Sequence, residues 1–339
     1  MIERDRVKAA FQYGVPDCTP YCAYLDNVQK QRLDEFYGGE SWQKMDNDHI
    51  HKIYAVDHYM RANGVTEKEG GRVIADCFGC MWDLGNIHHL INAPLKEDSI
   101  GDYKLPDIQN FYTKHSDPYI MREIENSQRK FRVVQHTFCL FERAWALRGF
   151  ENFLMDLALN PKFCEALISM IADWIVESVD RILLHPVDAV MFTEDYADQR
   201  GIIFGPEIFK RLFKPYWKKI LGRVKKAGVY SIMHVCGNSS PAIPDLIECG
   251  LDCIESLQPE AMDVYKLKQE YGRDIRLWGG VGIQKLMTFG TPAEVTEEVK
   301  RLKDCLGAGG GYVLAPTKVF NSAVPVENIA AYLEEASGY

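Results

Sequence analysis

The chain has 339 residues, of which 47% are hydrophobic and 26% are charged. These values are typical of a globular protein, so we expect a folded chain with a large core and exclude a disordered one. The net charge of −9 at pH 7 excludes a duplex-binding protein, because such a protein needs a basic face to neutralise phosphates. The most basic run, Lys214–Lys226, is predicted to form one amphipathic helix with a solvated side.

The N-terminal residues, MIERDRVKAAF, are charged and amphipathic and lack the apolar segment of a signal peptide. No stretch approaches the roughly 18 uninterrupted apolar residues of a membrane-spanning helix. We therefore expect a cytoplasmic protein that binds neither membrane nor nucleic acid. In a reducing compartment the ten cysteines are expected to be free thiols.

Short apolar runs alternate with longer helical patterns along the chain. Continuous apolar runs of this length are typical of strands in a parallel sheet buried on both faces. The predicted strands, in chain order, are Cys22–Leu25, Gly71–Phe78, Phe131–Phe138, Ala189–Thr193, Tyr230–His234, Asp252–Ser256, Ile275–Gly279 and Tyr312–Ala315.

Helices are predicted between these strands from apolar residues spaced three and four apart and from their capping residues. The segment beginning TPAE at Thr291 is a capping box with proline at the first helical position. The main predicted helices are Tyr119–Gln128, Asn160–Leu184, Pro206–Val224, Pro241–Cys249, Thr291–Leu306 and Pro325–Ser337.

Eight strands alternating with helices predict an α/β fold, a (β/α)₈ TIM barrel, because a parallel sheet of eight strands closes into a barrel. Two further helical patterns, DNVQKQRLDEFYGG and IHKIYAVDHYMRANG, lie between about residues 26 and 63. We interpret them as part of an N-terminal helical layer over about residues 1–70. The whole chain, 1–339, is expected to be one domain.

Ionisable residues follow several of the predicted strands, where such barrels build their active sites. Glu194 and Asp195 follow the fourth strand, Glu255 lies at the end of the sixth, and Lys318 follows the eighth. A buried acid is costly unless it is paired. We therefore take these four residues as candidates for catalysis or binding.

His234 and Cys236 form the clearest metal-binding candidate. They lie two residues apart at the end of the fifth strand, where Gly237 permits a break in the strand. Imidazole and thiolate are preferred ligands of Zn²⁺, and a catalytic zinc site uses about three protein ligands with one open position. Glu255, on the next strand, is the expected third ligand; the alternative interpretation is a structural histidine beside a buried cysteine.

Other cysteines are interpreted as packing residues. Cys77 and Cys80 have C-x-x-C spacing, but they fall at a predicted strand end rather than before a helix, so we favour two packed cysteines over a redox pair. Cys164, Cys249 and Cys305 lie in helical contexts and are expected to be buried. His88 and His89 are expected to line a pocket rather than to bind metal.

The chain resembles the uroporphyrinogen decarboxylase superfamily over nearly its whole length. The resemblance rests on segments such as LRGFENFLMDLALNPKF, HVCGN, GLDCIESLQPEAMDVYKLKQEYG and GGGYVLAPTKVFNSAVPVEN. It implies the TIM-barrel fold. An arginine-rich R-Q-A-G-R motif, which marks true uroporphyrinogen decarboxylases, does not occur between Met1 and Tyr54, so tetrapyrrole decarboxylation is not expected.

HVCGN resembles the zinc motif of the methylcobamide-dependent methyltransferases of this superfamily. That resemblance makes His234 and Cys236 zinc ligands, and a similarity to cobalamin-independent methionine synthases makes Glu255 a third. In both groups a second, distal cysteine completes the site. Ungapped alignment to the closing P-x-E-N motif places Lys318 where that cysteine would be, and an ammonium group cannot ligate zinc.

The resemblance implies a methyltransferase that moves a methyl group between a methylated corrinoid protein and a small acceptor, either a thiol or tetrahydrofolate, with zinc assisting. Glu194 and Asp195 would handle protons, and the charge of Lys318 would favour an anionic or weakly basic acceptor. The alternative is a metal-free decarboxylase or lyase in which Lys318 binds a substrate carboxylate, Asp195 and His234 move protons and the Arg200 region orients the substrate. A non-enzymatic corrinoid-handling protein is a third hypothesis.

Overall fold

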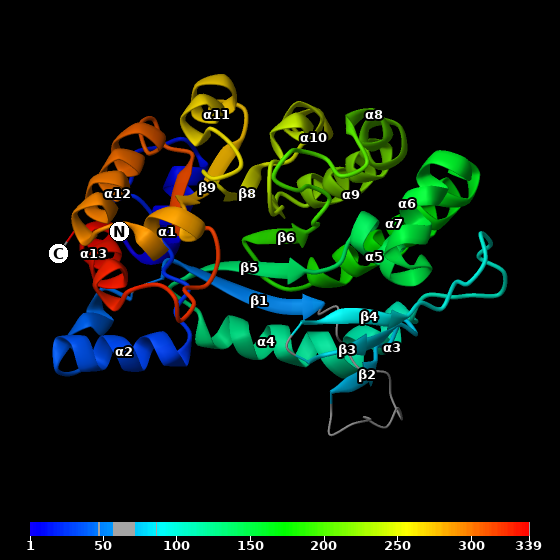
Figure 1. Cartoon of the computed structure of the whole chain (residues 1–339), viewed down its shortest axis with the longest axis horizontal. Coiled ribbons are helices and arrows are strands. Elements are labelled where there is room, and N and C mark those ends of the chain that lie inside the picture. The colour runs from blue at the N-terminus through cyan, green and yellow to red at the C-terminus, as the bar shows by residue number, and fades with distance from the viewer. Residues whose placement is uncertain (47, 57–71, 86, 339) are drawn as a thin grey trace.

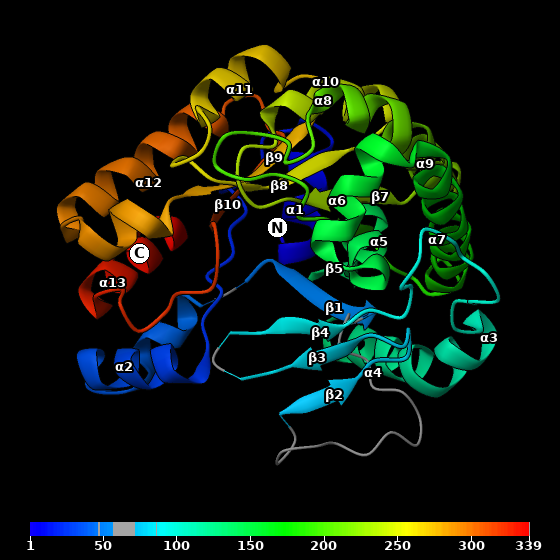
Figure 2. The same ribbon diagram turned by 45° about the vertical axis from the view of Figure 1, so that its right-hand side comes forward.

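The computed structural model describes residues 1–46, 48–56, 72–85 and 87–338. Seven parallel strands form one curled sheet in the order β1-β5-β6-β7-β8-β9-β10 (Figures 1 and 2). Hydrogen bonding between consecutive neighbours is parallel throughout, so the carboxyl ends of all seven strands meet at one end of the sheet. The strands are β1 Ile50–Val56, β5 Phe131–His136, β6 Ala189–Thr193, β7 Tyr230–His234, β8 Cys253–Leu257, β9 Arg276–Val281 and β10 Tyr312–Pro316.

The segment around Tyr21 joins the two edge strands of this sheet. Leu314 of β10 accepts a bond from the Cys22 N–H (3.0 Å) and donates its own N–H to Pro20 (2.8 Å), while the His49 N–H, just before β1, donates to the Tyr21 carbonyl (3.2 Å). Only an isolated bridge forms here, so the prediction of a full strand at Cys22–Leu25 is wrong. The architecture is therefore TIM-barrel-like, with seven strands and one bridging segment.

Two other predicted elements differ from the structure near the N-terminus. Residues Ile50–Val56, expected to be helical, form β1, in which Ile53, Ala55 and Val56 are buried. The predicted barrel strand Gly71–Phe78 contributes only β2 (Val73–Ala75), which belongs to a separate antiparallel sheet with β3 (Met81–Asp83) and β4 (His89–Asn92). The rest of the predicted helix, after Val56, and the first residue of the predicted strand, Gly71, fall within residues 57–71, which lie outside the described residues.

Helices cover the outer face of the curled sheet (Figure 2), and the six main predicted helices are confirmed to within a few residues. No helix among the described residues is long and apolar enough to cross a membrane. The α-helices are α1 Glu3–Phe11, α2 Asn27–Tyr37, α3 Ile108–Phe111, α4 Asp117–Asn126, α5 Leu140–Arg148, α6 Phe150–Leu159, α7 Pro161–Ile182, α8 Pro206–Ile208, α9 Lys214–Lys226, α10 Ile243–Cys249, α11 Val264–Tyr271, α12 Pro292–Leu306 and α13 Val326–Ser337. Short 3₁₀ or π turns occupy Glu40–Lys44, Tyr112–Ser116, Phe209–Phe213, Ser240–Ala242 and Ile283–Met287.

Two buried clusters hold these layers together. The larger one packs the helices against the sheet. The smaller one gathers side chains from the strands and from α1, including Phe11, Phe131 and Trp278. Because α1 contributes Val7 and Phe11 to this inner cluster, it covers the end of the sheet at which the strands begin. α1 does not cover the opposite end, where the strands finish and the candidate site residues lie.

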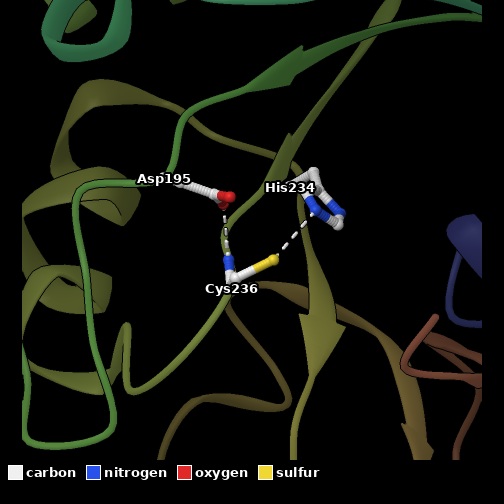
Figure 3. Close-up of side chains that lie close together, drawn as sticks. All are labelled: Asp195, His234 and Cys236. Carbon is white, nitrogen blue, oxygen red and sulfur yellow. Dashed lines mark hydrogen bonds between the residues drawn. The ribbon is translucent and has the colours of Figure 1, made fainter. Parts of the chain in front are cut away.

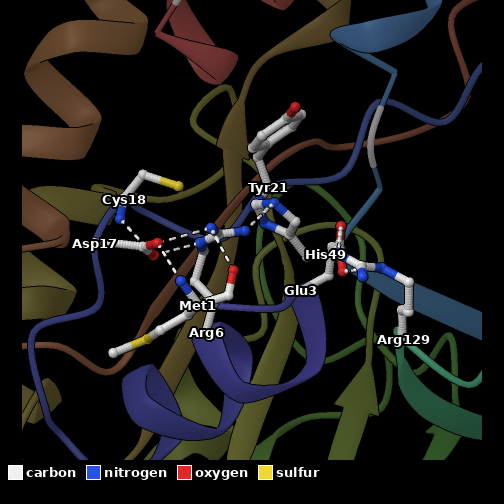
Figure 4. A network of polar contacts seen from close by, with 8 residues as sticks. All are labelled: Met1, Glu3, Arg6, Asp17, Cys18, Tyr21, His49 and Arg129. Atoms are coloured by element: carbon white, nitrogen blue, oxygen red, sulfur yellow. Dashed lines mark hydrogen bonds and ion pairs between the residues drawn. The ribbon is translucent and has the colours of Figure 1, made fainter.

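A polar network ties the N-terminal segment to the start of β1 (Figure 4). The Arg6 guanidinium bonds the Asp17 carboxylate (2.6 and 2.9 Å) and approaches Nε2 of His49 at 2.9 Å. The other ring nitrogen of His49, Nδ1, accepts the Tyr21 N–H at 3.0 Å. These contacts fasten α1 and the bridging segment to the edge of the sheet.

Candidate metal centre

His234 and Cys236 lie at the carboxyl end of β7, as the sequence predicts. His234 is the last residue of the strand, and the chain turns after Cys236 at Gly237, whose φ of +81° suits glycine. A Cβ at Gly237 would lie 2.5 Å from the Asp198 carbonyl oxygen. The turn that carries the cysteine therefore requires glycine on both conformational and steric grounds.

Asp195, at the end of the neighbouring strand β6, joins this pair (Figure 3). Its Oδ1 accepts the Cys236 N–H at 2.9 Å, and Cys236 Sγ lies 3.5 Å from His234 Nε2. One ligand atom from each of the three residues lies within 4.8 Å of the other two. The three side chains thus offer an imidazole, a thiol and a carboxylate to one point.

Glu255 approaches the other side of the His234 ring. This buried carboxylate on β8 hydrogen-bonds His234 Nδ1 through Oε2. Its Oε1 lies 3.4 Å from both Lys52 Nζ and the Tyr24 hydroxyl. Burial alone would raise its pKa, but the Lys52 charge and His234 outweigh burial and lower the pKa of Glu255 to about 2.

The pKa of His234 shifts in the opposite direction to that of Glu255. Burial alone would lower the pKa of His234, but the charge of Glu255 and the bonds to Cys236 and Glu255 raise the pKa of this imidazole well above its usual value. The imidazole ring therefore lies between Cys236, next to Nε2, and the Glu255 carboxylate, on Nδ1.

Lys318, in the loop after β10, reaches the same cluster. The charge of Cys236 is the main cause that raises the pKa of the Lys318 ammonium, and Asp195 and a hydrogen bond to Cys236 add to it. The lysine that the resemblance places at the position of a family cysteine thus lies beside the first cysteine.

Glu194 is buried beside the cluster rather than within it. Its Oε1 accepts the Glu142 N–H at 2.9 Å, and its Oε2 has no hydrogen-bond partner among the described residues. Burial raises the pKa of Glu194 to about 8. Glu142, on α5, accepts the Asp195 N–H, and its pKa lies well above the usual range because of burial and the charges of Asp195 and Glu194.

The sequence missed three residues that surround the cluster: Glu142, Lys52 and Tyr24. Glu142 lies on a helix rather than at a strand end, and Lys52 lies in a segment predicted to be helical. In IHKIYAV the two isoleucines are three residues apart with two polar residues between them, so no period-two alternation marks β1. No sequence signal marks Tyr24 either.

Several other candidates lie elsewhere. Cys80 is buried, and burial raises the pKa of both Cys77 and Cys80, which disfavours a redox thiolate. All ten cysteines are free; Cys164 and Cys249 are buried as expected, whereas Cys305 is exposed, contrary to expectation.

His88 and His89 line a cavity of about 540 Å³ beside β4 and the α5–α6 junction. Arg200 is 91% exposed and pairs with Asp198.

Two relatives and one solved structure define what the chain is similar to. A methylated-thiol–coenzyme M methyltransferase from Methanosarcina mazei is 24% identical over 64% of this chain and 57% of its own length. The methylcobamide:CoM methyltransferase MtbA of the same organism is 23% identical over 78% of this chain and 76% of its own length. The chain thus spans little more than half the length of the first relative.

The solved structure of a methyltransferase from Methanosarcina mazei superposes with a TM-score of 0.75 at 15% identity and covers 100% of this chain and 99% of the other. At that identity the likeness establishes the fold alone. The model of the family described as uroporphyrinogen decarboxylase (URO-D) matches residues 120–339. This match includes β5 to β10 and the His234–Cys236 turn, and because it covers well over half of the sequence, the chain belongs to the uroporphyrinogen decarboxylase (URO-D) family.

Proposed function

We propose that the protein is a zinc-assisted methyltransferase that moves a methyl group between a methylated corrinoid protein and a small acceptor, a thiol or tetrahydrofolate. The observation that carries the proposal is the convergence of Asp195, His234 and Cys236 at the carboxyl ends of two parallel strands. The two relatives, a methylated-thiol–coenzyme M methyltransferase and a methylcobamide:CoM methyltransferase, suggest the class of reaction. The protein is further proposed to close as a complete (β/α)₈ barrel, with the Tyr21 segment in the place of one strand.

The three side chains fit a zinc ion. Zn–N and Zn–S distances of about 2.0–2.1 and 2.3 Å in a tetrahedron separate the two ligand atoms by roughly 3.5 Å. Cys236 Sγ and His234 Nε2 are 3.5 Å apart. Asp195 would supply a carboxylate as the third ligand, which would leave a position on the zinc for the acceptor.

The third ligand is therefore proposed to be Asp195 rather than Glu255. Glu255 bonds Nδ1 of His234, whereas Cys236 approaches Nε2. A carboxylate on the second ring nitrogen fixes the tautomer and orientation of a metal-binding histidine. Glu255 is thus assigned to hold the ligand, and Lys318 is assigned no role as a ligand.

The remaining groups handle the acceptor. Zinc, when bound, acts as a Lewis acid that lowers the pKa of an acceptor thiol. Lys318 adds positive charge beside Cys236 and favours an acceptor that carries an anionic group. Glu194 and Glu142 are buried acids beside Asp195 that can exchange a proton with the acceptor.

Elemental analysis of protein purified without chelators tests the proposal. We expect about one zinc per chain in the wild type and little in His234→Ala and Cys236→Ala, because each substitution removes a ligand. Cys164→Ala, which alters a buried cysteine outside the cluster, is the matched control and should keep its zinc. Retained metal and retained methyl transfer in both ligand variants would refute the proposal.

The acceptor is then identified by assay with a methylated corrinoid and either a thiol or tetrahydrofolate. Wild-type protein without metal and without methyl transfer would instead favour the alternative, a metal-free decarboxylase or lyase in which Lys318 binds a substrate carboxylate. A protein that binds a corrinoid partner without any turnover would support the non-enzymatic alternative.

A further inference from the structure

Lys52 is an ammonium group inside the curled sheet. It lies on β1, its side chain is 17% exposed, and its Nζ lies 4.4 Å from the ring centre of Tyr24 and 5.0 Å from that of Trp278. Trp278 belongs to the inner core cluster. Placing a lysine among these aromatic rings costs solvation free energy, so the position calls for a specific partner.

That partner is Glu255, whose two carboxylate oxygens contact different residues. Oε1 lies 3.4 Å from Lys52 Nζ, and Oε2 bonds His234 Nδ1. Glu255 is only 2% exposed, and a buried carboxylate needs a cationic partner. If His234 binds a metal through Nε2, its ring is a neutral donor, and Lys52 is then the cation that balances Glu255.

We propose, on the basis of the proposed function, that Lys52 is a positioning residue of the metal centre. It fixes one oxygen of Glu255, so that the other oxygen holds the His234 ring with Nε2 turned toward Cys236. The order of contacts is Lys52, Glu255, His234, Cys236. Without Lys52, Glu255 loses its counter-charge and the constraint on the imidazole ring is weakened.

Zinc affinity measured by competition with a chromophoric chelator tests this role. Groups that orient a metal ligand from outside the coordination sphere typically change metal affinity by about 10- to 100-fold. We expect Lys52→Met to weaken zinc binding by about that factor. Lys52→Arg, which keeps the charge, should recover most of the lost affinity.

The matched control is Lys303→Met. Lys303 is also partly buried, with 23% of its side chain exposed, and it pairs with Glu335 at 2.8 Å, outside the metal cluster. Its loss removes an ion pair with a more exposed carboxylate (24% for Glu335 against 2% for Glu255) and should leave the zinc affinity unchanged. If Lys52→Met does not fold, Lys52→Gln keeps a hydrogen-bond donor without the charge and serves in its place.

Cobalt(II) in place of zinc gives a second readout that a general loss of stability would not move. We expect the visible absorption bands of the cobalt protein to shift in Lys52→Met and to return toward wild type in Lys52→Arg. Wild-type zinc affinity together with an unchanged cobalt spectrum in Lys52→Met would overturn the role of Lys52 alone. A wild-type protein that binds no zinc would overturn the proposed function and this role with it.

Discussion

At the scale of single residues, Lys318 distinguishes the proposed metal centre from the family pattern that the sequence resembles. Its ammonium lies beside Cys236, where we propose that its positive charge attracts an anionic group on the acceptor. We expect Lys318→Met to raise KM for an anionic thiol by about tenfold, since a hydrogen bond to a charged group contributes about 1.5–3 kcal/mol and exposure reduces that value. KM for a neutral thiol of equal size should change little.

Steady-state kinetics with the paired thiols measure this difference. Lys285→Met, which alters an exposed lysine after β9, is the control and should behave as the wild type with both acceptors. Equal changes in KM for the two thiols in Lys318→Met would show that Lys318 acts on the fold of the pocket rather than on acceptor charge.

The sequence predicted the two residues at the centre of the candidate site but not the residues around them. His234 and Cys236 were found because a two-residue spacing at a strand end is visible locally. The contact between Lys52 and Glu255 joins residues 203 positions apart, and it depends on β1, which was assigned to a helix. Glu255 was predicted to be a metal ligand with His234; the structure shows that it contacts Nδ1 of His234, whereas Cys236 lies beside Nε2.

At the scale of elements, the parallel strands were predicted best. The strands Ala189–Thr193 and Tyr230–His234 coincide with β6 and β7, because strands buried on both faces form continuous apolar runs. β1 was missed because IHKIYAV mixes polar and apolar residues. One face of β1 carries Lys52 toward Glu255, so its pattern reflects a charged site rather than a uniform core.

The start of helix α12 is a capping box, which was predicted from the sequence. The Thr291 hydroxyl accepts the Glu294 N–H (3.3 Å), and the Glu294 carboxylate accepts the Thr291 N–H (2.7 Å), which confirms the predicted capping box. We expect Thr291→Ala to lower the free energy of unfolding by about 1 kcal/mol, because a backbone N–H loses its cap.

Urea denaturation measures that loss. Thr296→Ala, within the same helix, is the matched control, since the Thr296 hydroxyl bonds the Pro292 carbonyl in the preceding turn and caps no helix end. This control should be neutral or slightly stabilising, because alanine has the higher helix propensity. Equal stability of the two variants would mean that the capping box contributes nothing.

At the scale of the whole molecule, the N-terminal residues complete the sheet. The bridging segment around Tyr21 connects β10 to the residue before β1, and α1 covers the end at which the strands begin. Such contacts join the first and last parts of the chain, so local patterns cannot reveal them. The sequence predicted eight parallel strands, whereas the curled sheet has seven: the first predicted strand lies beside the bridge at Tyr21, and β1 takes the place of the second.

Two titratable side chains beside the bridging segment, His49 and Asp48, have opposite effects on the pH dependence of stability. Burial and the Arg6 charge lower the pKa of His49 from 6.5 to about 4. Burial and the charge of Asp46 raise the pKa of Asp48, which accepts the Ala23 N–H, from 3.8 to about 6. Between pH 6 and pH 4 the unfolded chain therefore binds more protons than the folded chain at His49 and fewer at Asp48.

The two contributions therefore nearly cancel in the wild type and separate in single variants. His49→Gln removes the destabilising contribution, so acidification from pH 6 to 4 should cost this variant less stability than the wild type, by about 2 kcal/mol. Asp48→Asn removes the stabilising contribution, so the same acidification should cost it more, by a similar amount. Urea unfolding at pH 6, 5 and 4 measures both differences, and shifts of the same sign in the two variants would contradict the opposite protonation of His49 and Asp48 at the closure of the sheet.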